Sequence, residues 1–382
     1  MRLRILLAVT HLLGAGHLTR TAAIAGALAR AGHGVTLVSG GRPTAIVSMA
    51  GIEVVQLPPV HTRPGDFSAL LDEADRPVEP ALLDTRRTML LGVLDRTAPD
   101  VVVTELFPFG RRSLWAEFLA LAEAAARRKP RPLVLCSVRD ILVAPDKAEK
   151  VARAHSTLRD LFDGVLVHGD PTLLPLGASW PVDEAIARLV TYTGYVDPDP
   201  GGPPDAPVRS DGDVTVAGGS SSAALPLFRA ALEAARLVPE RTWRILVGRG
   251  VGAETADALR RGGPENVVVE TARPDFRDLL ARSSVFVGQA GYNTAVDLLR
   301  TRCRAVLVPY EEGRETEQRL RAEHLRDLGV AAVLPQAALD GTRLAEAVRS
   351  SLAGARPAGS LVDLEGASRL PGIIADLRAR PR

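Results

Sequence analysis

The chain has 382 residues, of which 46% are hydrophobic and 24% charged, and its formal net charge is +2. This length favours two domains, and so small a net charge excludes the basic surface with which proteins bind nucleic acid. The apolar runs are shorter than the ~20 residues that cross a bilayer, and two cysteines are too few for a disulfide framework, so we expect a cytoplasmic protein.

The first half of the chain alternates continuous apolar runs with amphipathic segments. This pattern is typical of a parallel sheet that helices cover on both faces. Strands are predicted at Arg4–Val9, Val35–Ser39, Ile52–Leu57, Val101–Glu105, Leu133–Val138 and Val165–His168. Helices are predicted at Leu18–Ala31, Thr88–Asp95, Trp115–Arg128 and Lys147–Leu161. We therefore expect residues 1–195 to form one doubly wound α/β domain.

Residues 196–213 interrupt this alternation with five prolines and three glycines, a composition that predicts a linker. The alternation then restarts, with a helix ending near Leu237 and strands at Val214–Ala217, Arg244–Val247, Val267–Glu270, Val285–Val287 and Ala305–Pro309. We predict a second α/β domain over residues 214–360, and a final helix within 361–382 that docks across the domains. Ligands of such sheets bind at the carboxyl ends of the strands.

A glycine-rich turn follows the first strand and contains Gly14, Gly16 and His17. Thr19 stands where the dinucleotide-binding fingerprint has its third glycine, so NAD binding is not expected. The helix dipole lowers the pKa of an imidazole at a helix N-terminus, so His17 can stay neutral and act as a general base. The alternative is a histidine that merely packs in the turn or caps the helix.

Two strand–turn–helix units in the second half predict binding of a diphosphate. Free backbone N–H groups and the helix dipole attract anions at such turns. The expected contacts come from Gly218, Gly219, Ser220, Ser221, Gly291, Tyr292, Asn293 and Thr294. Asp297, slightly further into the second helix, can accept hydrogen bonds from a ribose diol. The alternative is that these residues are ordinary helix caps.

A polar turn after Pro309 leads to Glu317 and Gln318 at the start of another helix. Their carboxylate and amide can bind sugar hydroxyls, although acidic residues in a first helical turn often only complement the dipole. The seven histidines show no zinc-ligand spacing. We therefore predict neither a metal nor a cofactor.

Together these features resemble the GT-B glycosyltransferases of family 28, the family that includes the N-acetylglucosaminyltransferase forming lipid II. The resemblance is strongest over residues 214–335 and weaker over 1–35. The middle of the first half is similar to a set of predicted bacterial glycosyltransferases, through the segments 105–112, 137–140 and 192–196.

The resemblance implies two Rossmann-like, doubly wound parallel-sheet domains that face a cleft, the GT-B architecture. It implies that the loop with His17 faces the acceptor and the donor phosphates, and that the turns at Gly218 and Gly291 hold the diphosphate. Asp297 takes the ribose-binding position in place of the family's glutamate, and Ala290 replaces a serine. Glu317-Gln318 replaces the glutamine pair that reads the sugar.

The expected function is transfer of a hexose-type sugar from a nucleoside-diphosphate sugar, with UDP favoured, to an acceptor hydroxyl. His17 is the expected base, Glu105 and Asp140 are reserve bases, and the reaction is expected to be metal-independent and inverting. The alternatives are a nucleotide-sugar hydrolase, which the loop Gly14–Arg20 also resembles, a nucleotide-sugar 2-epimerase, or a non-catalytic nucleotide-sugar-binding protein.

A lipid-linked acceptor would require peripheral contact with the inner face of the membrane. Apolar and basic residues in 107–115 and 127–131 could provide a landing surface. The alternative is that the aromatic residues belong to the core and the arginines to a solvated helix end.

Overall fold

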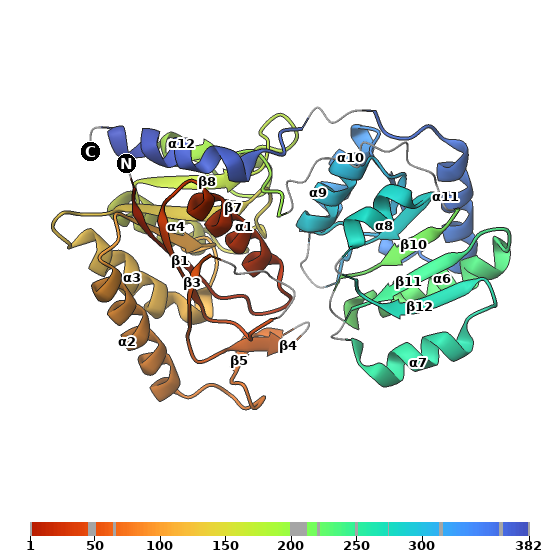
Figure 1. Ribbon diagram of the computed structural model, residues 1–382, viewed down its shortest axis with the longest axis horizontal. Coiled ribbons are helices and arrows are strands. Elements are labelled where there is room, and N and C mark those ends of the chain that lie inside the picture. Colours follow the sequence, from red (N-terminus) through yellow and green to blue (C-terminus); the bar gives the residue numbers. More distant parts are fainter. Residues whose placement is uncertain are drawn as a thin grey trace. The chain divides into compact units, whose positions relative to one another are not determined.

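The computed structural model describes residues 2–44, 51–63, 66–198, 212–219, 222–248, 251–273, 275–312, 316–358 and 362–380. Its contacts divide the chain into two units. The first unit comprises residues 1–200 and 362–382, and the second comprises residues 201–361. Each unit is an α/β domain built around a sheet (Figure 1).

The first unit has a parallel sheet of seven strands in the order β3-β2-β1-β6-β7-β8-β9. These strands are β1 (Arg4–Val9), β2 (Gly34–Ser39), β3 (Glu53–Gln56), β6 (Val101–Glu105), β7 (Leu133–Arg139), β8 (Gly164–His168) and β9 (Val190–Tyr192). The helices are α1 (Gly16–Arg30), α2 (Pro80–Thr97), α3 (Trp115–Ala126), α4 (Ala148–Leu161), α5 (Glu184–Leu189) and α12 (Gly366–Ala379). A small antiparallel pair, β4 (His61–Arg63) and β5 (Asp66–Leu71), lies outside this sheet. The strand order reverses between β1 and β6, which is where doubly wound sheets bind ligands.

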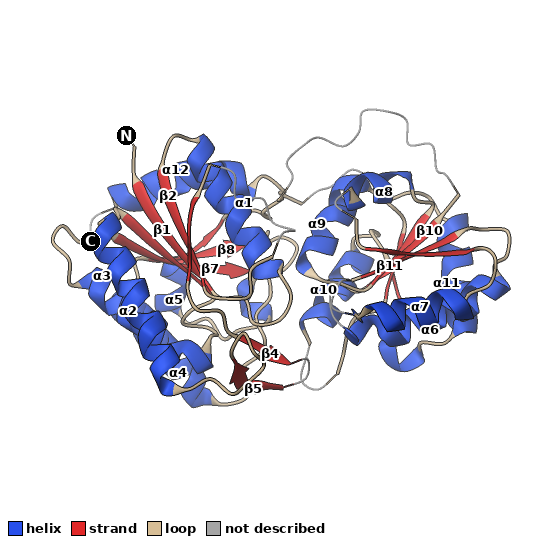
Figure 2. Ribbon diagram, turned by 60° about the horizontal axis from the view of Figure 1, so that its bottom comes forward, coloured by secondary structure: helices blue, strands red, loops and turns tan. Residues whose placement is uncertain are grey.

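Helices cover both faces of the first sheet, as Figure 2 shows. Successive residues of β1 point to opposite faces. Leu6 and Ala8 pack with α2, α3 and α4, whereas Ile5 and Leu7 pack with α1 and α12. The final helix α12 therefore completes the core of the first unit, where Ile374 is buried beside α1.

The second unit has a parallel sheet of six strands in the order β12-β11-β10-β13-β14-β15. The strands are β10 (Val214–Ala217), β11 (Trp243–Val247), β12 (Val267–Thr271), β13 (Val285–Gly288), β14 (Ala305–Leu307) and β15 (Ala332–Val333). The helices are α6 (Leu225–Leu237), α7 (Ala253–Gly262), α8 (Phe276–Arg282), α9 (Tyr292–Thr301), α10 (Glu317–Asp327) and α11 (Gly341–Ala353). Here the strand order reverses between β10 and β13.

Two boundaries differ from those expected from the sequence. Val196 and Asp197 are buried, and Val196 forms a β-bridge with Glu365, so the first unit extends into the segment predicted as linker. Residues 199–211 of that segment lie outside the described residues. Helix α2 begins at Pro80, eight residues before the predicted start, because proline is favoured at the first helical position where its missing N–H costs nothing.

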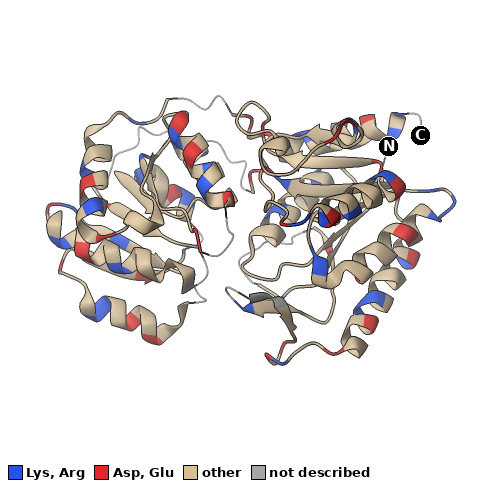
Figure 3. Ribbon diagram, turned by 180° about the vertical axis from the view of Figure 1, so that it is seen from behind, with Lys and Arg blue, Asp and Glu red and all other residues tan. Residues whose placement is uncertain are grey.

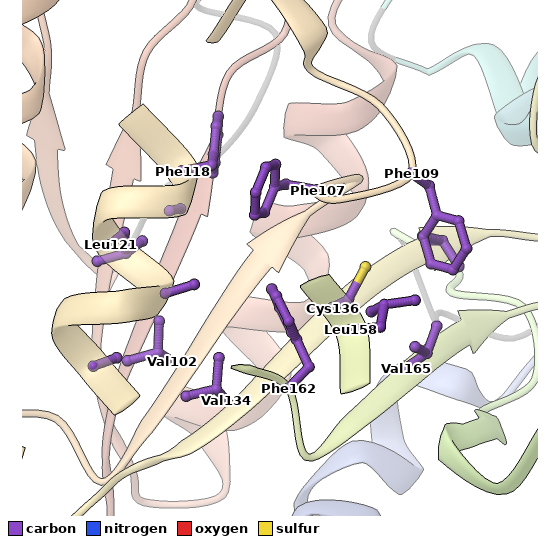
Figure 4. Close-up of a cluster of buried hydrophobic side chains, with 14 of the residues drawn as sticks. Val102, Phe107, Phe109, Phe118, Leu121, Val134, Cys136, Leu158, Phe162 and Val165 are labelled. Atoms are coloured by element: carbon purple, nitrogen blue, oxygen red, sulfur yellow. The ribbon is translucent and has the colours of Figure 1, made fainter. Parts of the chain in front are cut away.

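The aromatic residues proposed as a membrane-landing surface belong instead to the core. Phe107, Phe109 and Leu114 are buried, and Figure 4 shows Phe107 and Phe109 turned inward among apolar side chains. Phe107 stacks on Phe118 with ring centroids 5.6 Å apart. Acidic and basic residues are interspersed in both units rather than segregated by sign (Figure 3). Among the described residues, no helix combines the length and hydropathy that crossing a bilayer requires.

Candidate functional site

The first candidate site lies at the carboxyl ends of β1 and β6. Gly14 has a φ of +65° and turns the chain out of β1, and α1 then begins at Gly16. The first turn of α1 contains no acidic residue, and no side chain caps it. His17 Nδ1 lies 2.9 Å from Glu105 Oε1, at the end of β6. The structure therefore joins two residues that the sequence separates by 88 positions.

Glu105 is the centre of this network. Arg20 Nη2 donates to Oε1, and Ser137 Oγ donates to Oε2 over 2.6 Å. Burial by itself would raise the pKa of the Glu105 carboxyl, but Arg20 and the hydrogen bond from His17 hold this pKa well below its usual range. A carboxylate stabilised in this way is a poor proton acceptor, so the structure does not favour Glu105 as a reserve base. Its contact with Nδ1 fixes the orientation of the His17 ring.

His17 is held in its neutral form. Burial and the nearby Arg111 guanidinium lower its pKa to about 3, although its bond to Glu105 acts in the opposite direction. Because an ionised carboxylate can only accept, Nδ1 carries the imidazole proton and the lone pair is on Nε2. The His17 side chain is 16% exposed, so part of the imidazole ring is accessible to a ligand.

The network continues into β8 through His168. Its Nε2 lies 2.9 Å from Ser137 Oγ, and its Nδ1 lies 2.9 Å from Thr193 Oγ1. Burial and Arg20 lower the pKa of His168 to about 3. His168 is fully buried, and these contacts connect it to Ser137, which in turn donates to Glu105.

Asp140, the other predicted reserve base, follows β7 and is fully buried. Tyr195 donates its hydroxyl to Oδ2 over 3.0 Å, and the Ile141 N–H donates to Oδ1 over 2.9 Å. Both carboxylate oxygens are therefore engaged with protein groups. This arrangement anchors the turn after β7 and does not favour Asp140 as the base.

The two neutral histidines make the stability of the fold depend on pH. Their folded-state pKa of about 3 lies below the ordinary value of 6.5, so the unfolded chain binds more protons below pH 6.5. The free energy of unfolding is therefore expected to fall as the pH decreases from 6 to about 5, by ~1.4 kcal/mol per pH unit for each histidine. His168→Gln should remove one such contribution and flatten the slope, as measured by urea unfolding across this range. Parallel slopes in the two proteins would contradict the assignment.

The second candidate site lies at the carboxyl ends of β10 and β13. Ala217 and Gly288 are direct partners in the sheet, so the turns that follow them are adjacent. A Cβ on Gly218 would collide with Ala224, and Gly219 has a φ of +73°, so this turn requires both glycines. Gly291 precedes α9, whose first turn has no acidic residue. The Tyr292 side chain is buried, whereas the side chains of Asn293 and Thr294 are partly exposed.

The structure thus brings together Gly218, Gly219 and the start of α9, as the two predicted diphosphate-binding turns require. Ser220 and Ser221 lie outside the described residues.

Asp297 has a partner that the sequence did not indicate. Arg277 of α8 donates to Asp297 Oδ1 through Nε over 2.9 Å and through Nη2 over 2.8 Å. Both side chains are mostly buried. A ribose hydroxyl would therefore share this carboxylate with Arg277.

The prediction that Glu317 presents its carboxylate to a sugar is wrong for this structure. Its side chain is 5% exposed and pairs with Arg321, one helical turn later, over 2.8 Å. Arg321 also donates to Ala290 O over 2.8 Å. Gln318 Oε1 accepts from the Ala290 and Tyr310 N–H groups, each over 3.1 Å. Gln318 and Arg321 therefore connect α10 to the turns after β13 and β14, because the buried backbone N–H and C=O groups of those turns need hydrogen-bond partners.

Sequence reasoning missed Arg20, Arg111, Arg277 and His168 as members of these sites. Only Arg20 carried a usable signal, since it lies one helical turn after His17 on α1. In the described part of the chain, no three His, Cys, Asp or Glu residues are grouped in a way that could hold a metal ion.

Comparison with known proteins identifies relatives of the second unit and of the whole fold. Residues 213–358 match the glycosyltransferase family 28 C-terminal domain. One curated relative is the UDP-N-acetylglucosamine–N-acetylmuramyl-(pentapeptide) pyrophosphoryl-undecaprenol N-acetylglucosamine transferase of Rhodospirillum centenum. It is 29% identical over 148 residues, which are 38% of this chain and 39% of the relative. The chain thus matches about two fifths of the length of this relative.

Two solved structures are similar over almost the whole chain. The calicheamicin glycosyltransferase CalG4 superposes with a TM-score of 0.61 and 20% identity, covering 99% of this chain and 95% of that chain. MurG of Acinetobacter baumannii superposes with a TM-score of 0.61 and 16% identity, covering 98% and 99%. The chain therefore has the GT-B fold, and within its second unit residues 213–358 are similar to the C-terminal domain of glycosyltransferase family 28.

Proposed function

We propose that this protein is a glycosyltransferase that moves a hexose-type sugar from a nucleoside-diphosphate sugar to an acceptor hydroxyl. The observation that carries the proposal is the adjacency of the two glycine turns after β10 and β13, within the family 28 domain. UDP is the favoured nucleotide, because the Rhodospirillum centenum relative is named for a UDP-sugar. The pyrophosphoryl-undecaprenol in that name makes a lipid-linked hydroxyl the first acceptor class to test.

The second unit would bind the donor. Backbone N–H groups at Gly219 and at the start of α9 would stabilise the negative charge that grows on the leaving diphosphate. Removing one such donor typically costs ~3 kcal/mol of transition-state stabilisation. The proposal therefore includes a metal-independent reaction, and loss of turnover in EDTA would contradict that part.

The first unit would activate the acceptor. His17 Nε2 would take the hydroxyl proton while the acceptor oxygen bonds to the anomeric carbon and the bond from that carbon to the diphosphate oxygen breaks. The products are the glycoside, the nucleoside diphosphate and a protonated His17, whose charge Glu105 would stabilise. Direct attack of this kind inverts the anomeric centre.

Release of free sugar from the donor without acceptor, at rates comparable to transfer, would favour a hydrolase instead.

Donor binding can be tested with the ion pair of Asp297 and Arg277. Asp297→Asn is expected to weaken UDP binding about 10- to 150-fold, because a charge-assisted hydrogen bond contributes ~1.5–3 kcal/mol. Isothermal titration of UDP gives the dissociation constants, and Asp278→Asn, which changes an exposed carboxylate on α8, is the matched control. Equal UDP affinity in Asp297→Asn and wild type would contradict the proposal that the Asp297 carboxylate binds the ribose. Absence of UDP binding in the wild-type protein would exclude UDP as the donor nucleotide, and absence of binding by any nucleoside diphosphate would refute the proposed function itself.

A further inference from the structure

A chain of buried hydrogen bonds continues from Glu105 on the side away from His17, and it ends at Thr193, the residue after β9. Ser137 Oγ donates to Glu105 Oε2 over 2.6 Å, and the same oxygen lies 2.9 Å from His168 Nε2. On the other side of the ring, His168 Nδ1 lies 2.9 Å from Thr193 Oγ1. Glu105, Ser137, His168 and Thr193 are each at most 2% exposed. Bulk water therefore does not reach the chain, and its donors and acceptors have to satisfy one another.

The Glu105 end of the chain fixes the direction of the first hydrogen bond. An ionised carboxylate can only accept, and the Ser137 hydroxyl has a single proton, which is directed at Oε2. The contact between Ser137 and His168 must then run the other way, from Nε2–H to the serine oxygen. His168 is neutral, because burial and Arg20 lower its pKa to about 3, so its Nδ1 carries no proton. Nδ1 can therefore only accept, and the Thr193 hydroxyl lies at the distance needed to donate to it.

The Thr193 hydroxyl has a competing acceptor. Its oxygen lies 2.7 Å from Gly194 O as well as 2.9 Å from His168 Nδ1, and one hydroxyl proton cannot serve both fully. If that proton went to Gly194, the imidazole proton would move to Nδ1 and the Ser137 proton would turn toward Nε2. Each order contains three hydrogen bonds, but only the first ends on a charged acceptor. Hydrogen bonds to ionised groups are roughly twice as strong as neutral ones, so the order that ends on Glu105 is favoured.

The order of the protons determines how the Glu105 carboxylate is held. In the favoured order, Oε2 accepts from Ser137, while Oε1 contacts His17 Nδ1 at 2.9 Å and accepts from Arg20 Nη2. In the reversed order, the buried Oε2 loses the Ser137 proton, and the carboxylate is held on one side only. The His17 ring would then lose its fixed direction, on which efficient proton transfer depends.

We propose that His168 and Thr193 are positioning residues for His17. The Thr193 hydroxyl holds His168 as the Nε2–H tautomer. This tautomer directs the Ser137 proton at Glu105, and the carboxylate in turn orients the His17 ring. The role in catalysis rests on the proposed function, in which His17 accepts the proton of the acceptor hydroxyl, whereas the order of the protons does not.

The role of the hydroxyl can be tested with two substitutions of Thr193. Thr193→Val removes it at nearly constant volume and is expected to lower kcat about tenfold, with the donor KM unchanged. Groups that hold the histidine ligands of metal sites from behind contribute ~10–100-fold, and this effect lies at the lower end of that range. Thr193→Ser keeps the hydroxyl and should restore kcat to near the wild-type value. Steady-state transfer from a UDP-sugar provides the measurement.

Thr157→Val is the matched control for the loss of a buried hydroxyl. Thr157 is also buried in the first unit, but its hydroxyl donates to Arg153 O within α4 over 2.9 Å. Its kcat is expected to equal that of the wild type.

The order of the protons can be read without turnover from the ¹⁵N resonances of the imidazole rings, because protonated and bare ring nitrogens differ in chemical shift. His168 is assigned from the spectrum of His168→Gln, and His17 from that of His17→Ala. We expect the proton on Nε2 of His168 and on Nδ1 of His17. In Thr193→Val, the Nδ1 resonance of His168 should move toward that of a nitrogen that accepts no hydrogen bond.

A proton on Nδ1 of His168 in the wild type would overturn the proposal. So would wild-type kcat in Thr193→Val, or a loss of kcat in Thr193→Ser as large as that in Thr193→Val, because a role in packing alone does not depend on the hydroxyl. If the wild type has the expected order of protons but transfers sugar to no acceptor, the proposed function and the catalytic role fail, and the order of the protons stands.

Discussion

His17→Ala is expected to reduce kcat by about 10²–10⁴-fold, the usual contribution of a positioned general base. Nδ1 is held by Glu105 at 2.9 Å, so the imidazole has a defined tautomer and a fixed direction for Nε2. The donor KM should change little, because the turns proposed to bind the donor belong to the second unit. Steady-state transfer from a UDP-sugar to an acceptor, or its hydrolysis if no acceptor is found, provides the measurement.

The matched control is His33→Ala, which changes another histidine of the first unit, in the loop between α1 and β2. Its kcat is expected to equal that of the wild type. A His17→Ala enzyme with wild-type kcat would show that another group accepts the proton. A change confined to the donor KM would instead place His17 at the donor.

Glu105→Ala is expected to lower the free energy of unfolding by ~3–5 kcal/mol, the usual cost of removing one partner of a buried ion pair. Three protein groups donate to this carboxylate, and its side chain is only 1% exposed. After the substitution, Arg20 loses its buried counter-ion and Ser137 loses an acceptor. Urea unfolding at neutral pH measures the change.

Glu123→Ala is the matched control, because Glu123 pairs with Arg127 over 3.6 Å at a position where both side chains are exposed. Exposed pairs contribute only about 0–1 kcal/mol, so this variant should unfold close to wild type. Glu105→Gln keeps an oxygen acceptor without the charge and should fall between the two. Equal stability of Glu105→Ala and Glu123→Ala would mean that the Glu105 network does not stabilise the fold.

The main elements of both domains can be predicted from local patterns. The mostly apolar runs at 4–9 and 101–105 are the strands β1 and β6 with the predicted ends, because strands covered on both faces are apolar at nearly all positions. The positions of Gly14, Gly218 and Gly291 in strand–turn–helix units are likewise visible, since tight turns and close backbone approaches demand glycine. The missed hairpin β4–β5 and the early start of α2 at Pro80 have short or mixed patterns that carry little periodic signal.

By itself the sequence determined the α/β class, the glycine turns that begin the helices, and His17 as the candidate base. Only the tertiary structure decided how charges pair: His17 and Arg20 with Glu105, Arg277 with Asp297, and Arg321 with Glu317. Hydrophobic periodicity and turn chemistry are local properties, so they can be read along the chain. The protonation and partners of a buried charge depend instead on which strand ends the sheet order makes adjacent, and β1 and β6 become neighbours only when the sheet forms.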